Sequence, residues 1–188
     1  MAIGVADNSV PSIKSCALPP DSLLQGIANS GAFVDCYTTT IDRSVSQAAF
    51  IEAFYTTAIF KLERLILRVA LARPSTDTEA RQLARGDRDS FAAWSVEQRS
   101  AEQLLLRDFA GRTRSWLMVS TPSTGQSSLT QLYFGSAVVP LRNPKTGRSR
   151  MSFAFSALLG FHKLYSPVLL LAAKSRLTRK MESDDVHA

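Results

Sequence analysis

The side chains best suited to chemistry are one histidine and a group of arginines. His162 lies inside an apolar segment, three residues before Tyr165, where it could act as a general base or donate a hydrogen bond to a ligand. The alternative is a boundary histidine whose polar nitrogen faces water or a backbone carbonyl. The sequence places no carboxylate close to His162, so both interpretations stay open at this point.

Three arginines are predicted to lie close together on neighbouring strands. Arg112 and Arg114 alternate along one predicted strand and therefore share a face, and Arg107 is on the strand before it. Guanidinium groups this close could form a clamp for a carboxylate or a phosphate. The alternative is a set of opposite-charge pairs across the sheet. The carboxylates available for such pairs are Glu97, Glu102 and Asp108.

Four aromatic residues could form the floor of an apolar pocket or simply part of the core. They are Trp94, Trp116, Phe134 and Tyr165. With the arginine and the histidine above, the predicted ligand-binding residues are Trp94, Arg114, Trp116, Phe134, His162 and Tyr165. The sequence predicts no catalytic residue, no metal ligand and no cofactor, because nucleophile elbows, phosphate-binding glycine loops and His/Cys clusters are missing from it.

The two cysteines fit neither a zinc site nor a redox motif. Cys16 and Cys36 are separated by a spacing that matches no known metal or dithiol pattern. We expect isolated thiols in a reducing compartment.

Positive charge is concentrated in the second half of the chain. The net charge is +6, but residues 109–181 contain 11 basic residues and no Asp or Glu, and the acidic residues Glu182, Asp184 and Asp185 follow them. Such a stretch favours an anionic partner unless the fold brings carboxylates of the first half alongside it.

Basic residues bracket the last predicted helix. They could bind anionic lipid headgroups or phosphates, or they could be solvated charges that favour the C-terminal end of a helix. Aromatic residues are not interleaved with them, which argues against nucleic acid as the partner. The set comprises Arg142, Lys145, Arg148, Arg150, Lys174, Arg176, Arg179 and Lys180.

Hydrophobic periodicity predicts which elements position these side chains. A short helix is expected over Asp21–Asn29, a strand over Ala32–Ile41 and a long helix over Val45–Ala72 with a capping box at Ser44 and Gln47. A second capping box, Thr76 with Glu79, and Gly86 as C-cap predict a helix over Thr76–Arg85. Four strands then form a meander, because the joints between them are short. Their predicted ranges are Ser90–Arg99, Ala101–Phe109, Arg112–Thr121 and Ser128–Pro140.

The alternation along these strands assigns side chains to the two faces of the sheet. Both faces are expected to be at least partly covered. The inner face is predicted to carry Trp94, Val96, Leu104, Leu106, Trp116, Met118, Leu132 and Phe134. The other face is predicted to carry Leu105, Leu117, Val119 and Tyr133.

The last helix, Met151–Lys180, has an apolar face wider than the usual core-facing stripe. Val168, Leu169 and Ala172 are predicted on that face, and Lys174 in a narrow polar stripe. A central His162 and Lys163 argue against a membrane span, so we expect a cytoplasmic protein, with the surface of the inner membrane as a further option.

These elements predict one α+β domain: an antiparallel sheet of about five strands packed on a long C-terminal helix. The expected organisation is a flexible lead-in over residues 1–20, the domain over residues 21–180 and an acidic tail over residues 181–188.

This order of elements resembles the START-like, helix-grip superfamily. Three pieces are similar to an uncharacterised bacterial family placed near it: Gly86-Asp87-Arg88 with Phe91 and Trp94, the run Gly111–Trp116, and the run Phe161–Ser166. The resemblance covers roughly residues 32–180. It implies a curved sheet that wraps the C-terminal helix and leaves an apolar cavity between them. It implies no catalytic residue, because that family has no established activity.

Three functions follow as hypotheses. The first is binding of a hydrophobic or amphipathic, anionic small molecule between the C-terminal helix and the sheet. The second is a peripheral membrane or protein-interaction module that uses the basic, amphipathic C-terminal helix. The third, which we rank last, is an enzyme of cyclase or hydratase type in the same cavity. A fold alone cannot distinguish them.

Overall fold

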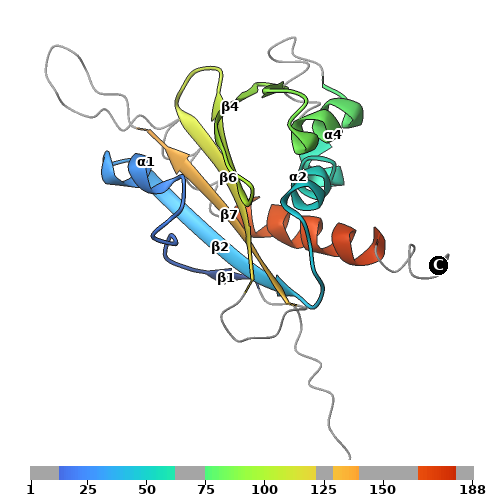
Figure 1. The fold of residues 1–188 in the computed structure, drawn as a ribbon. Coiled ribbons are helices and arrows are strands. Elements are labelled where there is room, and N and C mark those ends of the chain that lie inside the picture. Colours follow the sequence, from blue (N-terminus) through green and yellow to red (C-terminus); the bar gives the residue numbers. More distant parts are fainter. Residues whose placement is uncertain (1–12, 62–74, 122–128, 140–164, 181–188) are drawn as a thin grey trace, which may run out of the picture.

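The protein is an α+β domain in which one sheet separates two layers. Its computed structural model describes residues 13–61, 75–121, 129–139 and 165–180. Within these residues α2 (Gln47–Tyr55), α4 (Asp77–Arg85) and the C-terminal helix (residues 165–180) lie on one side of the sheet. The short helix α1 (Gln25–Asn29) lies on the other side, as Figure 1 shows. We call the two sides the helix face and the α1 face.

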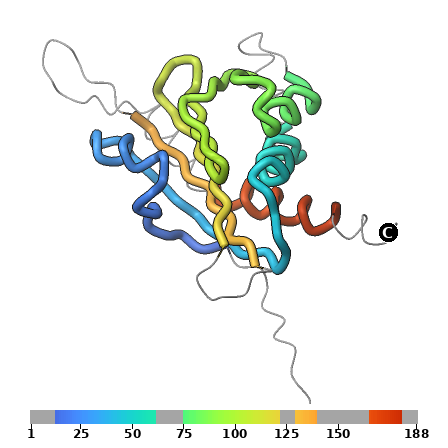
Figure 2. Tube along the Cα trace, in the orientation of Figure 1, coloured from blue at the N-terminus to red at the C-terminus, as the bar shows by residue number. Residues whose placement is uncertain are grey.

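The described sheet has seven antiparallel strands in the order β1-β2-β7-β6-β5-β4-β3. The predicted meander is confirmed as β4 to β7, and β2, from the first part of the chain, pairs along its length with β7. Figure 2 shows these two strands side by side. The strands are β1 (Lys14–Ser15), β2 (Phe33–Ile41), β3 (Ser90–Phe91), β4 (Trp94–Arg99), β5 (Gln103–Asp108), β6 (Thr113–Ser120) and β7 (Thr130–Val138).

The predicted count of about five strands is too low for two local reasons. Ala92 adopts a φ of 52°, and this left-handed residue reverses the chain, so the single strand predicted over Ser90–Arg99 is the hairpin β3–β4. The other additional strand, β1, falls in the predicted lead-in and pairs with β2 at the edge of the sheet.

The long helix predicted over Val45–Ala72 is interrupted. The helix α2 ends at Tyr55, and a second helical segment covers residues 58–61, beyond which residues 62–74 lie outside the described part. The break lies at Thr56 and Thr57, where the Thr57 hydroxyl accepts from the amide of Phe60 at 3.2 Å and so caps the second helical segment. The N-cap also differs from the prediction, since the side chain of Ser46 caps the helix by accepting from the amide of Ala49 at 3.2 Å.

The capping box predicted for the next helix is confirmed. The hydroxyl of Thr76 accepts from the amide of Glu79 at 3.2 Å, and the Glu79 carboxylate accepts from the amide of Thr76 at 2.8 Å. Gly86 ends α4 with a φ of 85°. Arg99 of β4 donates to the carbonyl of Leu83 at 2.8 Å and so joins the last turn of α4 to the sheet.

The C-terminal helix packs on the sheet through a stripe that only partly matches the predicted one, since Leu169 is buried as predicted. Leu170 and Ala173 are fully buried, whereas Val168 is 46% exposed and Leu171 is 41% exposed. Lys174, predicted in a solvated stripe, donates to the hydroxyl of Thr39 and to the carbonyl of Thr40 on β2. The predicted residues 151–164 of this helix lie outside the described part.

Both faces of the sheet are covered, as expected, but four side chains of β6 were assigned to the wrong face. Trp116 and Met118 belong to the α1 face, where Trp116 lies opposite Leu105 and Gly135. The cause is that β6 is buried on both faces from Thr113 to Val119, so alternation of hydrophobicity carries no information about its orientation. Leu117 and Val119 therefore face the helices instead.

Candidate functional site

The predicted ligand-binding residues divide between the two faces. Trp94, Phe134 and Tyr165 contribute to the core of the helix face, and Trp116 lies at the centre of the α1 face. Arg114, two residues before Trp116 on β6, shares the α1 face with it. His162 lies outside the described residues. The prediction of one pocket floored by both tryptophans is therefore wrong.

On the helix face, Trp94 has an unusual environment. Its indole Nε1 is buried and has no hydrogen-bond partner within the described part of the chain. The ring of Phe134 packs 4.7 Å from the ring of Phe54, and the hydroxyl of Tyr165 donates to the carbonyl of Ile59 at 3.4 Å. These contacts are those of a packed core, which is the alternative that the sequence left open for these aromatic residues.

Arg114 is occupied by the protein itself. Its side chain is 9% exposed and forms an ion pair with Glu97 of β4, across the intervening strand β5. It also donates to the carbonyl of Gly111 at 2.8 Å. The opposite-charge alternative is therefore confirmed for this arginine. An external anion would have to displace Glu97. This displacement is costly, because the guanidinium is buried and already paired.

Trp116 has a structural partner as well. Its indole Nε1 donates to Gln103 Oε1 at 2.9 Å, and the same oxygen accepts from the amide of Leu23 at 2.9 Å. The Gln103 amide group in turn donates to the carbonyl of Asp21 at 3.1 Å. Gln103 thus fastens the segment before α1 onto the sheet.

A row of small polar side chains crosses the helix face, and the sequence reasoning missed it. Ser115 of β6 and Ser136 of β7 lie opposite each other in register, and Ser136 lies opposite Asp35 of β2. Ser136 donates to Asp35 at 2.6 Å, and the hydroxyls of Ser115 and Tyr55 are 3.0 Å apart. Asp35 also accepts from Ser166 of the C-terminal helix at 3.2 Å, so the row holds this helix on the sheet.

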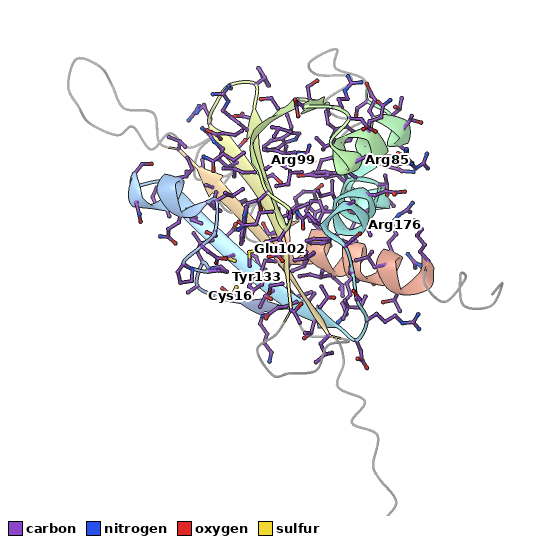
Figure 3. All side chains as sticks on the ribbon, viewed as in Figure 1. Cys16, Arg85, Arg99, Glu102, Tyr133 and Arg176 are labelled. Carbon is purple, nitrogen blue, oxygen red and sulfur yellow. The ribbon has the colours of Figure 1, made fainter. Side chains whose placement is uncertain are left out.

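The candidate binding site is a pocket of about 400 Å³ between α2, α4 and the C-terminal helix. Three cationic side chains and one carboxylate surround an apolar base. Figure 3 labels one of the cations, Arg176, on the C-terminal helix. The lining residues are Ala49, Glu52, Ala53, Arg81, Arg176, Leu177 and Lys180.

The charges of this pocket are unequal. Arg81 of α4 pairs with Glu52 of α2 at 3.2 Å, and the two side chains keep 46% and 29% of their surface exposed. Arg176 and Lys180 are four residues apart on the C-terminal helix and therefore project from the same side of it. The pocket thus carries an excess of positive charge over a base formed by Ala53 and Leu177, both of which are buried.

The sequence reasoning found only half of this pocket. Arg176 and Lys180 were among the basic residues that bracket the last helix, but Arg81 and Glu52 were not predicted as site residues. Nothing in the local sequence marks them, since they meet only because α2 and α4 pack against each other.

Comparison with protein-family models, with curated proteins and with solved structures gives no match for this chain. The resemblance to the START-like superfamily therefore stays a prediction. No group of three or more His, Cys, Asp or Glu side chains that could hold a metal ion occurs among the described residues. None of the helices in that same part of the chain is both long and apolar enough to cross a bilayer.

Proposed function

We propose that this protein binds a small organic anion with a short apolar part, in the pocket between α2, α4 and the C-terminal helix. The observation that carries the proposal is the excess of cations, Arg81, Arg176 and Lys180 against Glu52, around about 400 Å³ of space. The volume lies in the range of small-molecule pockets, roughly 300–1,000 Å³. The ligand chemistry is the same as that predicted from the sequence, but the pocket lies between three helices and not between the C-terminal helix and the sheet.

The chemistry of the pocket defines the ligand class. A carboxylate or phosphate could accept charge-assisted hydrogen bonds from Arg176 and Lys180, since neither cation pairs with the carboxylate of Glu52 as Arg81 does. The methyl groups of Ala49 and Ala53 and the side chain of Leu177 leave an apolar surface for a chain of a few carbons. Because Arg81 and Lys180 are exposed and Arg176 is half-buried, salt screens the attraction, and binding is expected to weaken as ionic strength rises.

Titration of the full chain with hexyl phosphate, followed by backbone amide NMR, tests the proposal. We expect shifts at Ala49, Ala53 and Leu177, weaker binding of inorganic phosphate and no binding of hexanol. Arg176→Ala is expected to weaken hexyl phosphate binding by about fivefold to tenfold, which corresponds to roughly 1–1.4 kcal/mol. The matched control is Arg179→Ala, which removes an exposed cation of the same helix outside the pocket and should change the affinity by less than about twofold.

Two outcomes would overturn this location. Equal losses in Arg176→Ala and Arg179→Ala would indicate non-specific attraction to a basic helix. Shifts at Trp94 and Tyr165 in place of Ala49 and Ala53 would place the ligand between the helix and the sheet, as the helix-grip architecture implies. That architecture is supported by the packing of Leu169, Leu170 and Ala173 on the helix face but is not required by the pocket.

A second candidate, a peripheral membrane module, is favoured by one separate observation. Val168 and Leu171, one turn apart on the C-terminal helix, are 46% and 41% exposed. Co-sedimentation of the protein with anionic phospholipid vesicles distinguishes the two functions. Co-sedimentation at low salt that is abolished by Leu171→Asp but unchanged by Arg176→Ala would favour the membrane over the pocket.

A further inference from the structure

The two cysteines, predicted to be isolated thiols, lie face to face at the edge of the sheet. Cys16 follows β1 and Cys36 belongs to β2, and the register of these strands places the two residues directly opposite each other. The amide of Cys16 donates to the carbonyl of Cys36 at 3.0 Å. Their Sγ atoms are 3.3 Å apart. The sequence could not show this because β1 was not predicted.

We propose that Cys16 and Cys36 form a reversible dithiol–disulfide pair that locks the segment between them onto the α1 face. Opposed residues of an antiparallel pair that share a backbone hydrogen bond have Cα atoms about 5.5 Å apart. This lies inside the range of roughly 4.4–6.8 Å that a disulfide accepts. The Sγ atoms must close from 3.3 Å to about 2.05 Å. The strand β1 can adjust because it has two residues and, among the described strands, pairs only with β2.

The oxidation needs a small-molecule disulfide such as oxidised glutathione as the electron acceptor. Cys16 is half-buried and Cys36 is buried, so the Cys16 thiolate attacks first. It forms a mixed disulfide and releases one glutathione thiolate. Cys36 then loses its proton to solvent, attacks the sulfur of Cys16 and displaces the second glutathione. Two protein thiols become one disulfide, and one oxidised glutathione becomes two reduced molecules.

Burial makes this pair slow to oxidise and suited to a structural lock. It raises the pKa of the Cys16 thiol and, more strongly, that of Cys36. Fast sensors of peroxide have exposed thiols with a lowered pKa, which these are not. In Figure 3 Cys16 is labelled beside Tyr133, on the same side of the sheet as α1.

The lock would act on a defined piece of structure. The cysteines are 20 residues apart, and the segment between them contains Leu23, Leu24 and Ile27, which cover the sheet around Trp116. In the reduced protein the segment is held by β1 and by the Gln103 side chain. A disulfide closes the loop covalently and suppresses local opening of this cover.

The full chain, equilibrated with defined ratios of oxidised and reduced glutathione, tests the proposal by intact mass and by alkylation after denaturation. We expect the loss of both alkylatable thiols, independent of protein concentration and reversed by reductant. Proteolysis between Leu18 and Ala32 should slow by about tenfold in the oxidised form. Retention of both thiols at the highest oxidised ratio, or disulfides between chains, would overturn it.

Two single variants test the order of attack. Cys36→Ser is expected to accumulate the glutathione adduct of Cys16, because no second thiol resolves it. Cys16→Ser is expected to leave Cys36 unmodified, because that thiol is only 3% exposed. Equal adduct formation in the two variants would contradict the assignment of Cys16 as the attacking thiol. Both variants change a sulfur to an oxygen only, and circular dichroism checks that each still folds.

Discussion

The two faces of the sheet are covered in different ways. The helix face has a continuous core to which α2, α4, the C-terminal helix and all the long strands contribute. Aromatic rings form its centre, where Phe54 lies within 4.7–6.2 Å of Phe50, Tyr55, Phe60 and Phe134. The α1 face has a smaller core, and a segment with one five-residue helix closes it.

The two faces differ in the number of contacts that hold the covering elements on the sheet. Removing one side chain from the helix face leaves several helices still packed on each other. The α1 face depends on Leu24, which lies against Trp116 and Gly135, and on the hydrogen bonds of Gln103. We infer that the helix face opens only when the whole domain unfolds, whereas the α1 face can open by itself.

The largest expected effect comes from truncation of a ring at the centre of the helix face. Phe54→Ala should lower the free energy of unfolding by about 3–5 kcal/mol, because Phe54 is fully buried among four other rings. Chemical denaturation measures the loss. Hydrogen exchange should speed up more at Phe50, whose amide exchanges through global unfolding, than at Leu23, whose amide already exchanges through local opening of the α1 face.

The matched substitution on the α1 face is Leu24→Ala, which also truncates a fully buried side chain. It is expected to speed exchange at the amides of Leu23 and Cys16 far more than at that of Phe50. Equal acceleration at all three amides would show that the two faces unfold as one unit and would end the distinction drawn between them.

A smaller effect is expected from the close approach at Gly135. A Cβ atom there would lie 2.9 Å from the indole of Trp116, 3.0 Å from Leu24 Cδ2 and 3.2 Å from the carbonyl oxygen of Asp35. The carbonyl belongs to the neighbouring strand and cannot withdraw without breaking the sheet. Gly135→Ala should therefore destabilise the protein by about 1–3 kcal/mol through overpacking.

The control is a glycine in the segment that covers the same face of the sheet. Gly26 lies in α1, and a Cβ added to it meets nothing within 4 Å. Gly26→Ala should stabilise the protein by about 0.4–1 kcal/mol, because the unfolded chain loses freedom that the helix does not use. Thermal denaturation of both variants measures whether each substitution raises or lowers the stability of the protein. A stabilising Gly135→Ala would show that the α1 face is loosely packed.

The sequence predicted those parts of the fold that depend on local patterns. The capping box at Thr76 and Glu79, the C-cap at Gly86 and the meander each follow from neighbouring residues, and all are present. The break at Thr56 and Thr57 is also local, but the apolar stripe continues across it, so periodicity alone could not locate it. The face of Trp116 depends on pairing with β5 and β7, which buries β6 on both sides.

The candidate site was harder to predict because it depends on contacts between distant segments. Arg81 and Glu52 are 29 residues apart, and the two cysteines are 20 residues apart. Arg114 was predicted as a ligand-binding residue although Glu97 was among its possible partners, because the sequence left open which of the two alternatives forms. Composition indicated an anionic partner. The location of the cationic pocket could not be predicted, because it depends on how three helices pack together.

The smallest expected effect is a loss of stability at alkaline pH, which comes from a buried thiol of the α1 face, Cys36. Burial raises the pKa of Cys36 above its ordinary value of 9.0, so in the folded state this thiol keeps its proton where the unfolded chain releases it. The unfolded state then binds fewer protons, and the free energy of unfolding falls as pH rises above 9.0. The loss from this one thiol is up to about 1 kcal/mol over the first pH unit.

Cys36→Ala removes this contribution, so its stability should fall less steeply than that of the parent protein between about pH 9 and pH 10. Denaturation curves at several pH values measure the slope. Burial also raises the pKa of Tyr133, so part of the loss of stability at alkaline pH remains in both proteins. Protein oxidised by glutathione should show a slope at least as shallow as that of the variant, because the disulfide removes both thiols whose pKa burial raises. An oxidised form with the slope of the reduced protein would mean that Cys36 is not one of the linked sulfurs.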